Sequence, residues 1–150
     1  MAAGSGGFDA NRVERSERMS KRLAEQLQEI LGAEHVVPGD EVPPSPWETH
    51  QPFRGRFMLM PASTDQIAAT LRLCSRAGQP VVPIGGLTNL VQGCATESGD
   101  AGLSLARMNA IEEIDPVAQT MTVQAGVTLR EAQEAADAAG LDWGGGRRPK

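Results

Sequence analysis

The sequence of 150 residues predicts an α+β fold, in which a small parallel or mixed sheet is flanked by helices and preceded by an N-terminal helix. Three observations predict it. Apolar runs at 57–60 and 80–84 enclose a helical stretch, which is the order of a β-α-β unit with a parallel pair of strands. Residues 111–115 and 120–125 have the pattern of a hairpin. An amphipathic stretch at 14–31 precedes them all.

The N-terminal helix is predicted over residues 14–31, where apolar residues recur at helical spacing, and Gly32 is its expected end. One face of this helix carries Met19, Leu23, Leu27 and Ile30. Residues 38–56 contain five prolines, which exclude regular structure along most of that stretch. We therefore expect a crossing segment or linker between this helix and the rest of the chain.

A second helix is predicted over residues 64–77. Ser63 and Gln66 form an S-x-x-Q capping box, with Thr64 as the competing cap, and Gly78 ends the helix. Its expected buried face carries Ile67, Leu71 and Cys74. The run at 80–84 then predicts a buried strand, which two glycines follow at once.

The last third of the chain predicts one further strand, a hairpin and a helix. Leu103 and Leu105 mark one strand, and a turn at Asp115-Pro116 joins the two hairpin strands. In the second hairpin strand, polar residues alternate with Met121, Val123 and Ala125, which predicts half-burial. Thr128 and Glu131 form a T-x-x-E capping box, and Gly140 ends the helix that follows. One side of this helix carries Leu129, Ala132, Ala136 and Ala139.

Composition and charge exclude several classes of function. The net charge of −5 and an aromatic content of 3% argue against binding to nucleic acid, which needs a basic surface and stacking side chains. No apolar run approaches the length of a membrane span, and the N-terminus has no signal-like apolar region, so we expect a cytoplasmic protein. Cys74 and Cys94 match no metal-binding spacing, and the sequence names no catalytic residue and no metal ligand.

The stretch from Pro83 to Cys94, PIGGLTNLVQGC, is the candidate ligand-binding segment of the sequence. Its glycines allow backbone N–H groups to turn toward one side and bind an anion, and Thr88 and Asn89 can add hydrogen bonds to phosphate oxygens. A mononucleotide P-loop is excluded because no Lys follows the glycines, and the G-x-G-x-x-G spacing of a Rossmann loop is absent. Two interpretations remain open on these residues alone, a longer loop along a pyrophosphate and a plain surface turn.

The wider pattern resembles the FAD-binding domain of the PCMH (vanillyl-alcohol oxidase type) flavoproteins, and within it the branch of D-2-hydroxyglutarate dehydrogenase and the glycolate oxidase D subunit. The resemblance runs from Phe53 to Leu141 through four stretches: FRGRFMLMPASTDQIAATLRLC, VVPIGGLTNLVQG, LSLARMNAIEEID and TMTVQAGVTLREAQEAADAAGL. It implies two regions, residues 1–52 with the first helix and the Pro-rich segment, and residues 53–150 as an incomplete FAD-binding domain without the substrate domain.

The resemblance implies FAD as the cofactor, with its pyrophosphate along the glycine-rich loop. The cofactor-binding residues it implies are Ile84, Gly85, Gly86, Leu87, Thr88, Asn89 and Gly93. Asn89 and Gln92 stand where that branch commonly has glycine, and Asn tolerates left-handed backbone. Family members that tether the flavin often use a His at the position of Leu87, so we expect FAD to be bound non-covalently.

The resemblance ends at Leu141, where the family continues with a second glycine-rich stretch and a substrate-binding domain. We therefore expect a truncated or frameshifted remnant of a longer enzyme, incomplete for catalysis. The parent would be an oxidoreductase that transfers hydride from the carbinol carbon of a D-2-hydroxy acid to flavin N5. The alternatives are a non-catalytic fragment with little or no FAD binding, and an enzyme like UDP-N-acetylenolpyruvoylglucosamine reductase.

Overall fold

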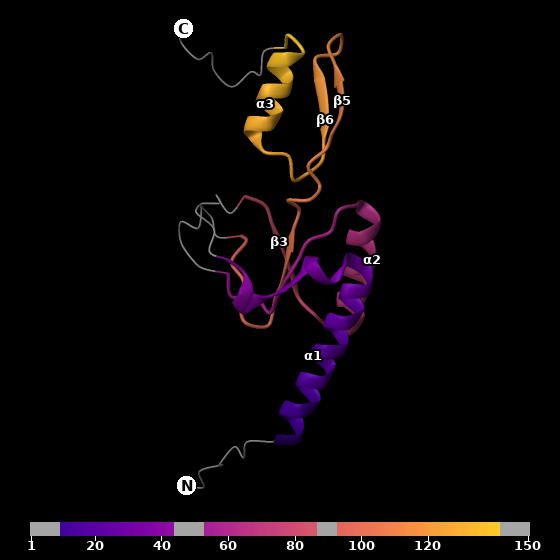
Figure 1. Ribbon diagram of the computed structural model, residues 1–150, viewed down its shortest axis with the longest axis vertical. Coiled ribbons are helices and arrows are strands. Elements are labelled where there is room, and N and C mark those ends of the chain that lie inside the picture. Colours follow the sequence, from indigo (N-terminus) through magenta and orange to yellow (C-terminus); the bar gives the residue numbers. More distant parts are fainter. Residues whose placement is uncertain (1–9, 44–52, 87–92, 142–150) are drawn as a thin grey trace, which may run out of the picture.

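The computed structural model describes residues 10–43, 53–86 and 93–141, with side chains in the first helix from residue 20 onward. The elements in chain order are α1 (Ala10–Leu31), the 3-10 turn η1 (Ala33–His35), β1 (Val36–Pro38), the 3-10 turn η2 (Gly39–Glu41), β2 (Phe57–Leu59), α2 (Thr64–Ala77), β3 (Val81–Ile84), β4 (Ala101–Ser104), β5 (Ile111–Asp115), β6 (Thr120–Val123) and α3 (Leu129–Ala138). Figure 1 shows β5, β6 and α3 together at one end, with α1, α2 and the larger sheet at the other. The predicted α+β class is confirmed.

The larger sheet has four strands in the order β1-β2-β4-β3. Strands β2, β4 and β3 are parallel, and β1 runs antiparallel to β2. The sequence predicted β2 and β3 as a directly paired unit, which is wrong, because β4 lies between them and pairs with both. The local sequence pattern shows the order of strands and helices along the chain, but it does not show which strands pair in the sheet. At Gly102 of β4 the lack of a side chain leaves room for two neighbours, since a Cβ atom there would lie 2.6 Å from side-chain atoms of both Ile84 and Phe53.

The two outer strands of this sheet each contain a proline, Pro38 in β1 and Pro83 in β3. Proline has no N–H to donate, so it is tolerated at the edge of a sheet and not at its centre. The sequence analysis did not predict β1, because three residues that end at a proline give no strand signal. The expected division of the chain at residue 52 stays a prediction, and in the structure β1 pairs with β2 across it.

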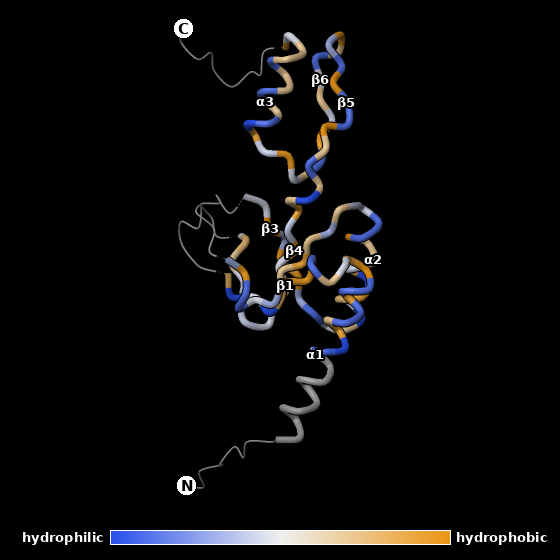
Figure 2. The backbone as a smooth tube through the Cα atoms, in the orientation of Figure 1, coloured by the Kyte–Doolittle hydropathy of each residue, from blue (hydrophilic) through white to orange (hydrophobic). Residues whose placement is uncertain are grey.

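The main core lies between one face of this sheet and the two helices α1 and α2. Residues of β2 and β4 two positions apart point to the same face, which α1 and α2 cover. The buried members of this core are Leu23, Leu27, Leu31, Val36, Phe57, Leu59, Leu73, Cys74, Ala101 and Leu103. Figure 2 shows apolar segments gathered where α2 and the strands meet. The predicted apolar face of α1 is therefore confirmed where its side chains are described.

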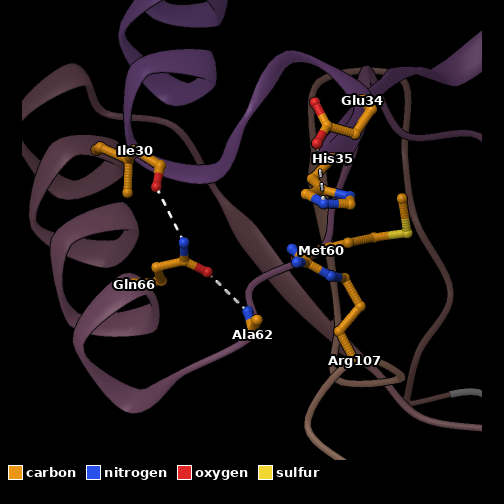
Figure 3. A network of polar contacts seen from close by, with 7 residues as sticks. All are labelled: Ile30, Glu34, His35, Met60, Ala62, Gln66 and Arg107. Carbon is orange, nitrogen blue, oxygen red and sulfur yellow. Dashed lines mark hydrogen bonds and ion pairs between the residues drawn. The ribbon is translucent and has the colours of Figure 1, made fainter.

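Helix α2 has the predicted bounds and the predicted N-cap, but only half of the predicted capping box forms, because the Gln66 side chain does not bond to the N–H of Ser63. The Ser63 hydroxyl accepts a hydrogen bond from Gln66 N at 3.2 Å, so Ser63 and not Thr64 is the N-cap. Gln66 Oε1 accepts from Ala62 N at 2.7 Å, one residue before the cap, and its Nε2 donates to Ile30 O at 3.2 Å (Figure 3). The Gln66 side chain thus ties the start of α2 to the last turn of α1. At the other end Gly78 has a φ of 64°, as the predicted stop requires.

The buried face of α2 differs in part from the prediction. Thr70, Leu73 and Cys74 are buried and Ile67 is partly buried against the core, whereas Leu71 is 41% exposed. Residues 67, 70 and 74 share one side of a helix with 3.6 residues per turn, and residue 71 lies at its border. Leu71 was therefore assigned wrongly to the buried face, because spacing alone does not decide which of two adjacent ridges meets the sheet.

Strands β5 and β6 form the predicted hairpin, with Ile114 opposite Met121. Asp115 Oδ1 accepts hydrogen bonds from the N–H groups of residues 117 and 118, at 2.8 and 2.9 Å, which confirms the turn. The predicted half-burial of β6 is only partly met: Met121 is half-buried and Val123 is 39% exposed. This two-stranded sheet has no third strand among the described residues, so part of its apolar surface faces solvent.

Helix α3 begins with the predicted capping box. The Thr128 hydroxyl accepts from Glu131 N at 3.3 Å, and the Glu131 carboxylate accepts from Thr128 N at 2.8 Å. Ala132 and Ala136 are buried as expected. Leu129 is 62% exposed, contrary to the prediction. It is the first helical residue, and helical side chains lean toward the N-terminus, so it extends past the helix end.

Candidate cofactor-binding loop

The candidate site begins at the carboxyl end of β3. Ile84, the last residue of that strand, is 2% exposed, and its carbonyl accepts a hydrogen bond from Leu105 N at 3.3 Å. Because β2, β4 and β3 are parallel, their carboxyl ends lie along one edge of the sheet. This edge is where ligands bind in parallel α/β sheets. The glycine-rich loop therefore leaves the core at a favourable place for a ligand.

Gly85 and Gly86 follow Ile84 directly and are exposed. A Cβ atom placed on Gly85 would meet no heavy atom within 4 Å, and its φ lies outside the left-handed region. Neither packing within the described chain nor backbone conformation thus requires glycine at position 85. Open space directly over the backbone is what a ligand needs for close approach, so Gly85 fits a bound cofactor.

Three predicted site residues, Leu87, Thr88 and Asn89, lie outside the described residues, as does Gln92. The description resumes at Gly93, which is exposed. The structure thus places Ile84, Gly85 and Gly86 at the sheet edge and Gly93 on the returning part of the loop.

The returning part of the loop is held by a threonine that the sequence analysis missed. Thr96 is 4% exposed, and its hydroxyl accepts hydrogen bonds from Arg54 N at 2.9 Å and Gly55 N at 3.1 Å. A single threonine among polar residues carries no periodicity and belongs to no motif. No signal in this sequence would have singled it out.

An arginine lies near the same edge of the sheet. Arg107 follows β4, and its Nη1 donates to the carbonyl of Met60, which follows β2, at 2.7 Å. Figure 3 shows this pair beside His35, whose Nε2 lies 3.4 Å from Glu34 Oε1. No carboxylate of the described ranges lies within 4.0 Å of the Arg107 guanidinium. A backbone carbonyl is uncharged, so the Arg107 guanidinium keeps its full positive charge. This charge favours an anionic ligand at this edge of the sheet.

Among the described residues, the remaining titratable groups form no second site. Burial raises the pKa of the Cys74 thiol, which keeps it protonated within the core. In the parts of the chain that the structure describes, no three His, Cys, Asp or Glu side chains are placed to hold a metal ion. No described helix is both long and apolar enough to span a bilayer.

A glycine-rich loop at the carboxyl edge of a parallel sheet, with open space over the backbone of Gly85, is the arrangement of a domain that binds a nucleotide cofactor. The comparison with protein families makes this specific. The family model of the FAD binding domain matches residues 56–146. The chain belongs to this family, which confirms FAD as the cofactor that the sequence predicted.

Two curated relatives and one solved structure illustrate the match. The chain is 36% identical over 84 residues to D-2-hydroxyglutarate–pyruvate transhydrogenase of Saccharomyces cerevisiae, covering 55% of this chain and 17% of that protein. It is 38% identical over 84 residues to glycolate oxidase subunit GlcD of Bacillus subtilis, covering 56% and 18%. The structure of p-cresol methylhydroxylase with substrate bound has a TM-score of 0.71 at 20% identity, covering 83% of this chain and 26% of that one. The chain thus spans less than a fifth of the length of these two curated relatives.

Proposed function

We propose that the loop from Ile84 to Gly93 binds the pyrophosphate of FAD, and that the whole protein is an oxidoreductase acting on a D-2-hydroxy acid. The observation that carries the loop assignment is the open space over Gly85 at the carboxyl end of β3. The names of the relatives, a D-2-hydroxyglutarate transhydrogenase and a glycolate oxidase subunit, support the substrate class. They favour this branch over an enzyme like UDP-N-acetylenolpyruvoylglucosamine reductase.

In this proposal each part of the loop has a separate role. Ile84 fixes the start of the loop in the core, and the N–H groups of Gly85 and Gly86 bind phosphate oxygens. Leu87, Thr88 and Asn89 continue along the diphosphate, and Gly93 lets the chain turn back. When bound, FAD supplies the redox chemistry by accepting two electrons from the substrate, while the protein supplies binding and orientation.

Two further points belong to the proposal. Leu87 offers no nucleophile for attachment, so FAD is held non-covalently and acid or heat should release all of the flavin from the chain. Flavin that stays on the denatured chain would contradict this. A cytoplasmic location is supported by Cys74, which is a free, buried thiol in the core.

The loop assignment is tested by a matched pair of glycine substitutions. Gly85 and Gly99 both lack positive φ, and at both positions a Cβ atom would have no heavy atom within 4 Å, so the two positions are matched in the space they offer at Cβ. We expect Gly85→Val to weaken FAD binding at least about tenfold, because its side chain occupies the approach to the backbone, and Gly99→Val to leave it unchanged. The measurement is a titration of the purified chain with FAD, followed by flavin fluorescence.

Equal affinity of Gly85→Val and the unaltered chain would place the diphosphate elsewhere. Absence of FAD binding by the unaltered chain would favour the alternative, a non-catalytic segment with little or no affinity for the cofactor. Thermal unfolding of both variants without FAD serves as the control for folding.

A further inference from the structure

The described chain passes once from the four-stranded sheet to the group formed by β5, β6 and α3, through residues 105–110 (Figure 1). We call this stretch the joint segment, the group after it the small unit, and the four-stranded sheet with α1 and α2 the sheet unit. The orientation of one unit relative to the other depends on how the joint segment is held at each of its ends.

On the side of the sheet unit, the joint segment is bonded to the strands on both sides of β4. Leu105 N donates to the carbonyl of Ile84, the last residue of β3, at 3.3 Å. Arg107 Nη1 donates to the carbonyl of Met60, which follows β2, at 2.7 Å. Because β4 lies between β2 and β3, these two hydrogen bonds lie on opposite sides of it. Two such bonds fix the direction of the segment, whereas one alone lets the segment rotate about it.

On the side of the small unit, the joint segment is held by the stretch between β6 and α3. Gln124 N donates to Ala110 O at 2.9 Å, and Gln124 Oε1 accepts from Ala110 N at 3.2 Å. Gly126 N donates to Met108 O at 2.8 Å, and a Cβ atom at position 126 would overlap the Leu105 carbonyl oxygen. The joint segment is therefore closely packed against the start of the small unit.

The hydrogen bond of Arg107 differs from the others just described. It is the one among them that a side chain of the joint segment makes. This side chain is half-buried and reaches across to Met60 (Figure 3). A hydrogen bond with a charged donor is stronger than one between neutral groups. Replacing Arg107 thus removes one of the two bonds on the side of the sheet unit and leaves the backbone bonds in place.

We propose that Arg107 sets the orientation of the small unit: its hydrogen bond to Met60 O holds the joint segment against the carboxyl edge of the sheet, and without it the small unit moves as a body while both units stay folded. The family model of the FAD binding domain spans both units, residues 56–146, so the joint segment lies inside the cofactor-binding domain. Motion there moves the small unit relative to Gly85, where the glycine-rich loop begins. The proposal holds wherever the diphosphate binds.

Three variants test the role of this hydrogen bond. Arg107→Met keeps an unbranched side chain and has no hydrogen-bond donor. Arg107→Lys keeps a charged donor and serves as the rescue variant. Arg72→Met is the matched control, because Arg72 on α2 is exposed and its side chain has no hydrogen bond or ion pair among the described residues.

Two measurements are made on the complete chain without FAD. Nitrogen relaxation by NMR gives the rotational correlation time of each unit, and amide hydrogen exchange follows the N–H groups of Leu105 and Met108, which donate to Ile84 O and Leu105 O. In Arg107→Met we expect a shorter correlation time for the small unit than for the sheet unit, and about tenfold faster exchange at these two amides. Exchange within β2 and β6 should stay within about twofold of the unaltered chain.

The unaltered chain, Arg107→Lys and Arg72→Met should each show one correlation time for both units. Equal correlation times in Arg107→Met would overturn the proposal, because other contacts would then set the orientation. The same change in Arg72→Met, or no recovery in Arg107→Lys, would mean that the lost hydrogen bond is not the cause. Faster exchange throughout β2 and β6 would show a general loss of stability instead. Different correlation times in the unaltered chain would show that the joint segment is not fixed, which also contradicts the proposal.

Discussion

Thr70 offers a direct test of how the core is stabilised. Its side chain on α2 is completely buried, and no described group donates to or accepts from its hydroxyl. A buried polar group without a partner costs roughly 1–3 kcal/mol relative to its hydration in the unfolded chain. Valine has nearly the same shape and helix propensity, and it replaces the hydroxyl with a methyl group. Thr70→Val should therefore stabilise the protein.

We expect a gain of about 1 kcal/mol in the free energy of unfolding, the lower end of that range, because the denatured chain retains some structure. For a chain of this length the gain corresponds to a rise of about 2–4 °C in the unfolding temperature. Urea unfolding followed by circular dichroism measures it, with an unchanged slope as the sign that only stability has changed.

Thr70→Ser is the companion variant, since it keeps the hydroxyl and removes the methyl group. It should destabilise the protein by about 1 kcal/mol through the lost apolar contact. A loss of stability in Thr70→Val would refute the reasoning, because it would mean that the hydroxyl has a partner in the folded protein.

Two further predictions concern the second part of the chain. Gly126→Ala should destabilise the protein by about 2 kcal/mol or more in urea unfolding, because its Cβ would overlap the Leu105 carbonyl oxygen; unchanged stability would mean that the two backbones do not lie so close. Hydrogen bonds from Thr128 hold the pKa of the Glu131 carboxyl below its ordinary value of 4.5. The ionised Glu131 therefore stabilises the folded protein at pH values above 4.5, and this stabilisation is lost as the pH falls through the lower pKa of the folded state. Glu131→Gln should flatten this acid-side loss of stability, and an unchanged pH profile would contradict the assignment.

The elements with marked ends were predicted well from the sequence. Ser63, Gln66 and Gly78 determine where α2 starts and stops, and the predicted bounds agree with the structure. The hairpin turn at Asp115 and the cap of α3 at Thr128 follow from equally local hydrogen bonds. In each case the groups that fix the end of the element lie within four residues of one another. Both partners of each hydrogen bond therefore appear in one short stretch of the sequence, where they can be recognised.

Features that depend on contacts distant in sequence were not predicted. The insertion of β4 between β2 and β3 is set by backbone pairing with strands that lie far from it in the sequence. The Thr96 hydrogen bonds join residues more than 40 positions apart. At the candidate site, the start of the loop was predicted because PIGG follows a strand. Thr96, which holds the returning part of the loop, was not predicted.

The prolines at the two outer strands have a consequence for the protein in concentrated solution. An exposed strand edge offers N–H and C=O groups that invite pairing with another molecule, which is a common start of aggregation. Pro38 and Pro83 each remove a donor from the edge they occupy, on opposite sides of the same four-stranded sheet. Growth of this sheet by addition of strands from neighbouring molecules is therefore disfavoured on both sides.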